Sequence, residues 1–496
     1  MSPLPRRALF FFSAITYIRE AEPVALYFAR RGWQVRVVFG LSGEPLDEYA
    51  ARLKAGGIDA VVAPDGLSYG RVESAKEAMA REDVPTPPKP PRPSALKRLL
   101  RCIGILRLLQ VPSHLPRLFK IRRYGETLLD DWQPSVVFQG TYHSVGQIDN
   151  AVSRACKMRG IPVFGLPNSP YLGETILRVA RKNHLVTGMA GNYLRVDYDL
   201  FSRLLALVFP SWTRQLGDGV TRVFYWDQTM MVAAWLSGLL MNRPWLKPSL
   251  DFDGTFLFSQ FTRNLLKGDY PDARMHVYGQ PLLDEFMARI GTPEHAAAVS
   301  AATGVPVGVP FILFNVEPAA EHLYRPWDQH RQDMRVMMQG LKARGLPIVL
   351  SLHPLCHEHE YTFAEAEFGA RICRDMRIHE IYAYCGISVS FPCSTNLLAE
   401  PFDRPLVIYD MDGLISRDEE SRTMNWLPNV GVANRPSELQ DILQAVTPAP
   451  PLSAVRQTQG ACEMIFRHVE RHVARLRGAP AAAESQSLHT NQEAHQ

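Results

Sequence analysis

The sequence predicts an α/β protein of two doubly wound parallel-sheet domains that face each other across a cleft. Three observations favour this fold class. The 496 residues are about three times the length of a typical domain of ~150 residues. Apolar runs of strand length alternate with segments of helical periodicity, which is typical of parallel sheets covered on both faces. This alternation occurs twice, before and after a Gly/Pro cluster at 304–310.

The first domain opens with a strand-helix-strand unit. An apolar run at 7–12 predicts the first strand, and residues 18–31 carry helical spacing. Gly32 ends that helix before a second strand at 33–39. The same pattern predicts a helix at 145–159 and further strands at 58–63, 134–139, 161–165, 255–259 and 274–278.

Two insertions interrupt this pattern. The first, 84–123, begins with a proline-rich segment at 84–94. Proline can neither donate a backbone hydrogen bond nor continue a helix, so this segment is predicted to be an extended connector. Its basic part, 92–123, holds nine Lys or Arg and no acidic residue, with apolar positions at helical spacing. It is either a basic amphipathic helix for an anionic membrane surface or acceptor, or a surface helix packed on its own domain. The second insertion, 172–250, is rich in aromatic residues and predicts helices that shape the cleft.

Beyond the Gly/Pro cluster the alternation resumes. The pattern predicts strands at 311–316, 348–352, 387–390 and 406–409, and helices at 327–344, 378–384, 395–401, 437–446 and 455–476. We therefore expect Rossmann-like domains over 1–303 and 304–450, followed by a C-terminal helix over 451–477. The tail at 478–496 is expected to be disordered, because it has little apolar surface to bury.

Composition and charge exclude several classes of protein. With 46% hydrophobic and 21% charged residues, the chain resembles a soluble globular protein rather than a collagen-like, disordered or coiled-coil one. The net charge of +4 is too small to indicate nucleic-acid binding. Seven cysteines without a C-x-x-C pair suit reduced thiols in the cytoplasm. We expect neither a secretory signal nor a membrane span.

Polar groups follow the strands of the second domain, whereas a P-loop, a G-x-S-x-G elbow, H-E-x-x-H and an early G-x-G-x-x-G are missing. His353-Pro354 ends one predicted strand, and Ser394-Thr395-Asn396 opens the helix after another. Hydroxyl and N–H groups at a helix start bind phosphate oxygens, and Glu400 further along is placed to accept bonds from a ribose diol. Together they predict a nucleotide site, although Ser394-Thr395-Asn396 alone would also fit an ordinary N-cap.

These residues give the chain a resemblance to a known superfamily. The stretch from about 311 to 432 resembles the nucleotide-binding half of GT-B-type glycosyltransferases. The relevant relatives are the non-hydrolysing UDP-N-acetylglucosamine 2-epimerases, bacterial capsule sialyltransferases with an HP motif, and CDP-glycerol-type transferases. The resemblance is carried by His353-Pro354, Ile381-Tyr382, Cys393-Ser394-Thr395, Glu400 and the run 404–409. Upstream, Gly279-Gln280 lies in a run similar to the hinge motif of those families, and Ile18-Arg19-Glu20 loosely resembles the epimerases' Arg-Pro-Glu loop.

Departures from the pattern separate the relatives. The epimerases carry an Asp in a Gly-Asp-Thr turn where this chain has Gly140-Thr141-Tyr142-His143, and a Glu where it has Leu166-Pro167-Asn168-Ser169. The acid/base pair for proton removal at C2 is therefore not visible, which disfavours an epimerase. His143 occupies the corresponding loop and is either a base for an acceptor hydroxyl or a histidine that is merely hydrogen-bonded there.

Metal ligands and further carboxylates were weighed as well. Asp251-Phe252-Asp253 and Asp410-Met411-Asp412 both match D-x-D, and the double match shows how weak so short a signal is. The cluster His353, Cys356, His357 and His359 has spacing that is awkward for tetrahedral zinc. The resemblance implies catalysis without a metal. Glu317 and Glu321 follow the first strand of the second domain and are either general bases or solvated carboxylates.

The sequence therefore predicts a nucleotide-sugar-dependent, metal-independent glycosyltransferase of surface polysaccharide (capsule) or glycolipid assembly. The second domain would bind the donor and the first the acceptor. The expected donor-binding residues are Gly279, Gln280, His353, Ser394, Thr395, Asn396 and Glu400. The expected catalytic residues are Glu20, His143 and Glu317, and Arg19, Asn168 and Ser169 are expected to line the acceptor side.

The predicted setting is cytoplasmic, with peripheral attachment to the inner face of the cell membrane through 92–123. The expected ligands are the nucleotide-sugar donor and a polysaccharide or glycolipid acceptor, with no cofactor, metal or nucleic acid. The alternatives are a sugar-nucleotide 2-epimerase, a CDP-polyol phosphotransferase and an inactive scaffold of the same fold.

Overall fold

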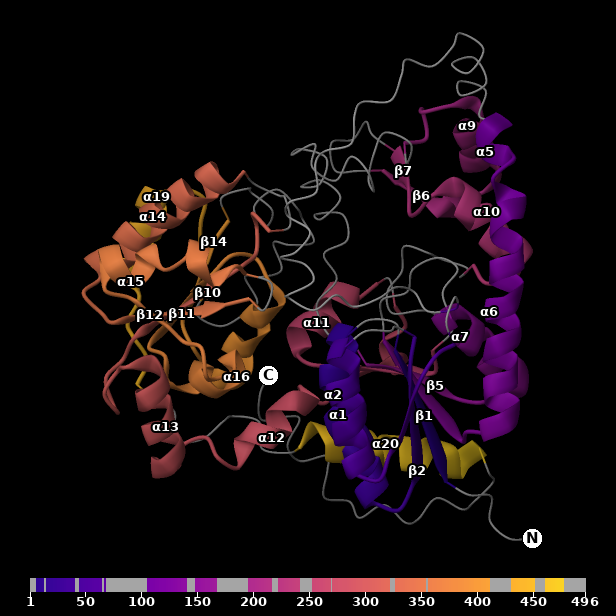
Figure 1. The fold of residues 1–496 in the computed structure, drawn as a ribbon, viewed down its shortest axis with the longest axis horizontal. Helices are drawn as coiled ribbons and strands as arrows, with labels where there is room; N and C mark the ends of the chain where they lie inside the picture. The colour runs from indigo at the N-terminus through magenta and orange to yellow at the C-terminus, as the bar shows by residue number, and fades with distance from the viewer. Residues whose placement is uncertain are drawn as a thin grey trace.

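The fold was analysed in a computed structural model, shown in Figure 1. The structure describes residues 6–12, 15–40, 44–64, 67, 105–140, 148–166, 195–215, 222–240, 252–268, 270–321, 326–353, 356–410, 430–450 and 460–476. The predicted connector at 84–94, the apolar positions 96–103 and the tail at 478–496 lie outside these residues.

The first domain is built on a seven-stranded parallel sheet of order β3-β2-β1-β4-β5-β8-β9. The strands are β1 (Arg7–Phe12), β2 (Gln34–Phe39), β3 (Asp59–Val62), β4 (Val136–Gly140), β5 (Val163–Leu166), β8 (Gly254–Leu257) and β9 (Met275–Val277). The strand order reverses between β1 and β4, which is the Rossmann-like arrangement.

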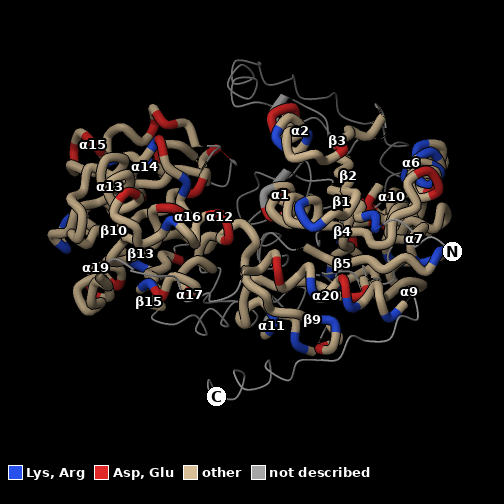
Figure 2. Tube along the Cα trace, turned by 90° about the horizontal axis from the view of Figure 1, so that it is seen from below, with Lys and Arg blue, Asp and Glu red and all other residues tan. Residues whose placement is uncertain are grey.

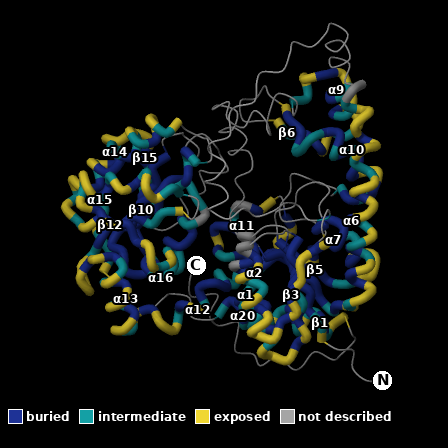
Figure 3. The backbone as a smooth tube through the Cα atoms, viewed as in Figure 1, coloured by how far each residue is buried: buried dark blue, intermediate teal, exposed yellow. Residues whose placement is uncertain are grey.

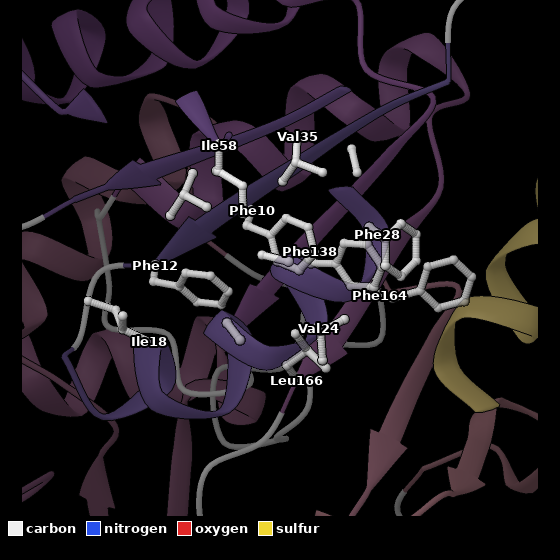
Figure 4. Packing of buried hydrophobic residues seen from close by; sticks show 14 of the residues in the cluster. Phe10, Phe12, Ile18, Val24, Phe28, Val35, Ile58, Phe138, Phe164 and Leu166 are labelled. Atoms are coloured by element: carbon white, nitrogen blue, oxygen red, sulfur yellow. The ribbon is translucent and has the colours of Figure 1, made fainter. Parts of the chain in front are cut away.

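Helices cover both faces of this sheet because its strands are apolar on both sides. Phe10 and Phe12 point to the face covered by α1 (Ile15–Arg30), α2 (Glu44–Ala55) and α20 (Ala461–Leu476). Leu9 and Phe11 point to the face covered by α6 (Val111–Trp132) and α7 (Ile148–Arg159). Figure 4 shows the aromatic core of the first face, in which the rings of Phe10 and Phe138 stack with centroids 4.4 Å apart.

Helix α6 is longer than the sequence pattern indicated. Pro112 stands in the first turn of α6. Backbone N–H groups in a first turn have no partner within the helix, so a proline there costs no hydrogen bond. Gln133 ends the helix in a left-handed conformation, and its N–H bonds to Leu129 O at 2.8 Å. The start of α6 carries a small subdomain, in which a short helix from the first insertion packs with helices and a hairpin from the second. Its elements are α5 (Ile105–Leu108), α9 (Leu200–Val208), η2 (Pro210–Trp212), β6 (Thr213–Gln215), β7 (Arg222–Phe224) and α10 (Gln228–Leu236).

The chain crosses to the second domain after β9. Gly279 takes φ +88°, a left-handed conformation that suits glycine, and turns the chain into η4 (Pro281–Leu283) and α12 (Asp284–Met287). Phe286, and Val299 of α13 (Pro293–Thr303), pack in the core of the second domain. The chain therefore enters that domain near residue 281, upstream of the expected boundary at 303/304.

The second domain has a six-stranded parallel sheet of order β12-β11-β10-β13-β14-β15, which reverses between β10 and β13. Its strands are β10 (Ile312–Val316), β11 (Ile348–Leu352), β12 (Arg371–Ile372), β13 (Ile387–Ser390), β14 (Leu406–Tyr409) and β15 (Val430–Ala433). Its helices include α14 (Trp327–Ala343), α15 (Phe363–Phe368), α16 (Ile378–Ile381), η6 (Tyr382–Tyr384), η7 (Ser394–Leu398), α17 (Ala399–Phe402) and α19 (Pro436–Ala445). The predicted fold class of two Rossmann-like domains is confirmed.

Helix α20 returns from the second domain and closes the first (Figure 1). The Asp284 carboxylate accepts hydrogen bonds from the backbone N–H groups of Ala461 and Cys462, at 2.9 and 2.8 Å, and so caps α20. Ile465 and Val469 then join the aromatic core over the sheet. Among the described helices, none combines the length and apolarity needed to cross a membrane.

Candidate functional site

Three adjacent strands of the second sheet bring the expected residues together at their carboxyl ends. In the sheet order, β10 lies between β11 and β13. Val316 pairs with Leu352, so Glu317 and His353 leave the sheet side by side, and His353 N–H bonds to Val316 O at 3.1 Å. Cys393 follows β13 on the other side. The reversal of strand order between β10 and β13 is where doubly wound sheets bind ligands.

Glu317 is the residue at the centre of this edge. It is half-buried, and the Cys393 side chain hydrogen-bonds to its carboxylate. Burial raises the pKa of Glu317 to about 7, and the same hydrogen bond opposes that shift. Burial raises the pKa of the Cys393 thiol to about 12. Near neutral pH the carboxyl group is therefore present in both protonation states beside a protonated thiol.

The loop after β13 is braced from within. Asn396 Nδ2 donates to Phe391 O at 3.1 Å, and the Ser390 hydroxyl donates to Asn396 Oδ1 at 2.5 Å. The Thr395 hydroxyl lies 2.8 Å from the Cys393 sulfur. Asn396 is fully buried, and its side chain holds the loop in shape. The helix expected at 395–401 is a 3₁₀ turn at 394–398 followed by α17, because the loop bonds tighten its first turn. The side chain of Ser394 lies outside the described residues.

His353 leaves the neighbouring strand with its side chain exposed. Its carbonyl oxygen accepts a bond from Cys356 N–H at 2.8 Å, so the backbone turns directly after the histidine. Of the expected donor-binding residues, the structure thus gathers His353 and Thr395 with Glu317 at one edge of the second sheet. Cys393 joins them, although its sequence position alone assigned it no role. The feature of the sequence that could have indicated a role for Cys393 is its position between a predicted strand and a predicted helix.

Glu400 lies where the second domain meets the first. Its carboxylate accepts hydrogen bonds from the Ser259 hydroxyl and from Gln260 N–H, which follow the carboxyl end of β8 at the start of α11 (Gln260–Leu266). Burial raises the pKa of Glu400. The second oxygen, Oε2, is buried and has no hydrogen-bond partner among the described residues. Phe261 packs beside this contact in the core of the second domain.

Glu20, predicted as a catalytic residue, and Gln280, predicted as a donor-binding residue, contact each other where the chain crosses between the domains. Gln280 Nε2 donates to Glu20 Oε1 at 2.7 Å, and Leu282 N–H lies 3.4 Å from Glu20 Oε2. Glu20 is buried, and its carboxylate is engaged by the chain segment that enters the second domain. Both oxygens of the Glu20 carboxylate are therefore engaged in this contact. Arg19 lies on α1, and its side chain is outside the described residues.

The other reversal point, between β1 and β4, is closed by an aromatic ring. Gly140 ends β4, and a Cβ atom added there would lie 2.7 Å from the ring of Tyr17. Any larger residue at this position would displace the tyrosine. The expected residues of this region, His143, Asn168 and Ser169, lie outside the described residues.

Glu321 and Asp253 have structural partners. Glu321 accepts bonds from His357 N–H at 2.9 Å and from the Tyr361 hydroxyl at 3.2 Å. Asp253 accepts a bond from Val163 N–H at 2.8 Å. Within the described part of the chain, no three His, Cys, Asp or Glu side chains are grouped to hold a metal ion.

The chain matches no protein-family model and no curated protein. Several solved structures are similar to it. One is CalG4, the calicheamicin glycosyltransferase, at 15% identity over 97% of this chain and 96% of that chain, with a TM-score of 0.46. Another is a UDP-N-acetylglucosamine 2-epimerase from Rickettsia bellii, at 12% identity over 96% and 98%, with a TM-score of 0.47. The epimerase from Neisseria meningitidis bound to UDP-GlcNAc has 11% identity over 94% and 99%, with a TM-score of 0.44.

Glycosyltransferases and UDP-N-acetylglucosamine 2-epimerases, both of which the sequence resembles, are therefore among the similar structures. Because these TM-scores lie below 0.5, the functional argument rests on the residues of the site and not on this similarity.

Proposed function

We propose that the chain is a glycosyltransferase whose second domain binds a nucleotide-sugar donor at the carboxyl ends of β10, β11 and β13. The observation that carries this proposal is the meeting of Glu317, His353 and the Cys393-Thr395 turn at the reversal of strand order. An imidazole, a hydroxyl and a carboxyl group that is partly protonated near pH 7 are suitable partners for the phosphates and sugar of such a donor.

In the proposed reaction an acceptor hydroxyl oxygen attacks C1 of the donor sugar. The bond from C1 to the phosphate oxygen breaks, and the nucleotide leaves with the bonding electron pair. His353 and the Thr395 hydroxyl stabilise the charge that develops on the phosphate, which is electrostatic stabilisation of a leaving group. We assign no metal to this step. The protonated form of Glu317 donates a hydrogen bond to the donor, where the ionised form would repel it.

The acceptor's proton needs a base from the first domain. His143 is our candidate, because its loop follows the strand that ends at the β1/β4 reversal. Glu400 is proposed to accept a ribose hydroxyl through its unpartnered Oε2 while its other bonds join the two domains. Closure of the domains would exclude water and so limit hydrolysis of the donor.

The proposed acceptor is a surface polysaccharide or a glycolipid, and the proposed compartment is the cytoplasm. The acceptor class rests on the resemblance to bacterial polysaccharide transferases. The six described cysteines are free thiols, which is the state that a reducing compartment maintains.

The test has two steps. In the first, nucleoside mono- and diphosphates of uridine and cytidine are added to the full chain, and a ligand that binds only the folded form raises the midpoint of thermal unfolding. In the second, the nucleotide-sugar of the base that binds is incubated with and without candidate acceptors, and the products are identified by mass spectrometry and NMR. A transferase releases the nucleotide in an acceptor-dependent way.

Three other results would overturn the proposal. An epimerised sugar that is still attached to its nucleotide would indicate an epimerase. Release of a nucleoside monophosphate from a CDP-polyol would indicate a phosphotransferase. No stabilisation by any nucleotide would indicate a scaffold that keeps only the fold.

A further inference from the structure

Exposed apolar side chains gather on the subdomain at the start of α6. Sixteen large hydrophobic residues are exposed in the described part of the chain, and nine of them belong to this subdomain. We call these nine the apolar tip: Leu108, Leu109, Tyr198, Leu200, Leu204, Leu207, Val208, Trp235 and Leu236. Figure 1 places the subdomain at one end of α6, away from α20 at the other end.

Helix α9 provides the centre of the tip. Leu200, Leu204 and Leu207 recur at a spacing of three or four residues and so share one face of the helix. Leu207 is 79% exposed and Val208 is 64% exposed. Figure 3 shows exposed segments in the region of α9 and α10. The opposite face, with Ser202 and Ala206, is buried. The helix is therefore apolar on both faces, and only one of them is covered within the described structure. Clusters of exposed apolar residues of this kind mark interaction surfaces.

The tip is held in place by the elements beneath it. Arg107 binds Asp199 at 3.5 Å and Asp227 at 3.0 Å, and so ties α5 to the starts of α9 and α10. The rings of Phe209 and Trp212 stack with centroids 4.0 Å apart, and the centroids of the Trp235 and Phe209 rings are 5.2 Å apart. The exposed residues are thus presented by a braced surface, which lowers the entropic cost of binding.

The same region has an excess of positive charge. The described residues within 105–123, 195–215 and 222–240 hold nine Lys or Arg and three Asp, against a net charge of +4 for the whole chain. All three aspartates are paired with arginine, because Asp199 and Asp227 bind Arg107 and Asp197 binds Arg195. Figure 2 shows the basic residues concentrated on α6, where Lys120 and Arg123 are exposed.

We propose that the apolar tip docks on an anionic lipid bilayer. Leu204, Leu207 and Trp235 would enter the boundary between headgroups and acyl chains, while Lys120 and Arg123 face lipid phosphates. An exposed apolar stripe beside uncompensated basic residues is the pattern of interfacial membrane binding. A nucleic-acid partner would leave the leucines in water. The sequence pattern pointed to 92–123 for membrane binding, and the structure adds α9 and α10 as the inserting part. This inference goes beyond the proposed function, since it holds whether or not the chain transfers a sugar.

Flotation of the full chain with lipid vesicles tests the proposal. We expect binding to vesicles of phosphatidylcholine mixed with phosphatidylglycerol, and at least tenfold weaker binding to phosphatidylcholine alone. The double variant Leu204→Gln/Leu207→Gln should weaken binding to the anionic vesicles about tenfold or more. The matched control is Val307→Gln, which removes a residue of 63% exposure from the second domain and should bind as the wild type does.

A second pair of variants separates charge from apolar contact. Lys120→Glu/Arg123→Glu should lower binding and flatten its dependence on salt, whereas Lys54→Glu on α2 should change neither. The fluorescence of Trp235 should shift to the blue on binding, and the shift should be missing in Trp235→Phe.

Circular dichroism and the unfolding midpoint show that each variant is folded, and nucleotide binding should stay unchanged in all of them. Unchanged nucleotide binding would show that a loss of vesicle binding is independent of the proposed transferase function. The proposal is overturned if the wild type fails to float with anionic vesicles, if it binds neutral vesicles equally well, or if the folded leucine variant binds like the wild type. A protein partner would then be the remaining occupant of the tip.

Discussion

The Glu20 carboxylate accepts a hydrogen bond from Gln280 Nε2 at 2.7 Å, and this bond joins two residues 260 positions apart. Glu20 lies on α1 of the first domain, whereas Gln280 lies on the segment that leads into the second. The bond therefore fixes how the chain leaves the first domain. Both residues were expected in a ligand site, and their contact with each other gives them a role in the hinge.

Replacing Glu20 by Ala should destabilise the protein. It leaves the Gln280 amide and the Leu282 N–H without their acceptor in a buried place, which costs about 1–3 kcal/mol. The free energy of unfolding in urea measures this loss, and Glu48→Ala on the exposed face of α2 is the control. The effect of Glu20→Ala/Gln280→Ala should be smaller than the sum of the two single changes. Additive effects would contradict a direct bond.

Glu400→Gln should separate the two roles of this carboxylate. If Oε2 accepts a ribose hydroxyl, the wild type should bind a ribonucleotide about tenfold more tightly than its 2′,3′-dideoxy analogue, and the variant should lose this preference. Calorimetry with both ligands provides the measurement. Ser259→Ala is the matched control, because it removes the bond between the domains, together with the N-cap bond to Thr262 N–H, and should keep the preference. A wild type that does not distinguish the two nucleotides would rule out the ribose contact.

The sheets could be predicted from the sequence because both faces of most strands are buried. In β1, Ala8 to Phe12 are apolar at every position after Arg7, and this uninterrupted run by itself indicates a buried strand. A helix was predicted within 92–123, but α6 begins at Val111 and continues to Trp132, beyond the last residue of that basic segment. The strands β12 and β15 were not predicted, because they are too short or too mixed in composition to show the alternation of apolar and polar residues that is typical of a strand.

The candidate site could be predicted only in part, because its geometry depends on the order of the strands. His353 and Cys393 are 40 residues apart in the chain, and β10 lies between their two strands in the sheet. The raised pKa of Glu317 comes from burial that only the folded sheet provides, and the Cys393 thiol that opposes the shift is also brought there by the fold. The roles of Asn396 and Glu400 as a loop brace and a domain contact depend on partners that no local pattern marks.

His353→Ala should lower turnover about 100-fold if the imidazole acts on the charge of the leaving phosphate. Steady-state rates with a saturating donor test this, together with donor affinity measured separately. His359→Ala, six residues downstream and exposed, is the control and should change neither. An unchanged rate in His353→Ala would remove this residue from the proposed mechanism.

Donor affinity should depend on pH through Glu317. Its pKa is about 7, so the carboxyl group is mainly protonated at pH 6 and mainly ionised at pH 8.5. The ionised form repels a diphosphate, and we expect binding of the nucleotide-sugar to weaken about tenfold across this interval. The diphosphate of a nucleotide-sugar has no group that titrates there. Glu317→Gln should lose less affinity between the two pH values than the wild type does, and an equal pH dependence in the variant would contradict the assignment.

The contact between α20 and the first sheet should weaken in acid. His276 and His468 lie with ring centroids 4.1 Å apart, and the Tyr278 hydroxyl is 3.0 Å from His468 Nδ1. Burial lowers the pKa of His276 to about 4 and that of His468 to about 3, and neighbouring histidines and arginines act in the same direction. Burial also lowers the pKa of His472, although Asp253 opposes the shift.

These lowered values fix the sign of the effect. Above pH 6.5 the three histidines are neutral in both states and add no pH dependence. Below pH 6.5 the unfolded chain takes up protons on these histidines before the folded chain does, so stability falls as the pH falls toward 4. Each such histidine contributes a slope of up to about 1.4 kcal/mol per pH unit. Urea unfolding between pH 7.5 and 4.5 at constant ionic strength measures the slope.

The variant His468→Phe should reduce this acid dependence, because it keeps an aromatic ring in the cluster and removes one titrating group. His359→Phe, at an exposed position, should leave the slope unchanged. Carboxylates elsewhere titrate in the same interval, so the comparison between the variants carries the result rather than the slope of the wild type. If His468→Phe and the wild type lose stability equally between pH 6.5 and 4.5, His468 does not titrate as its burial requires.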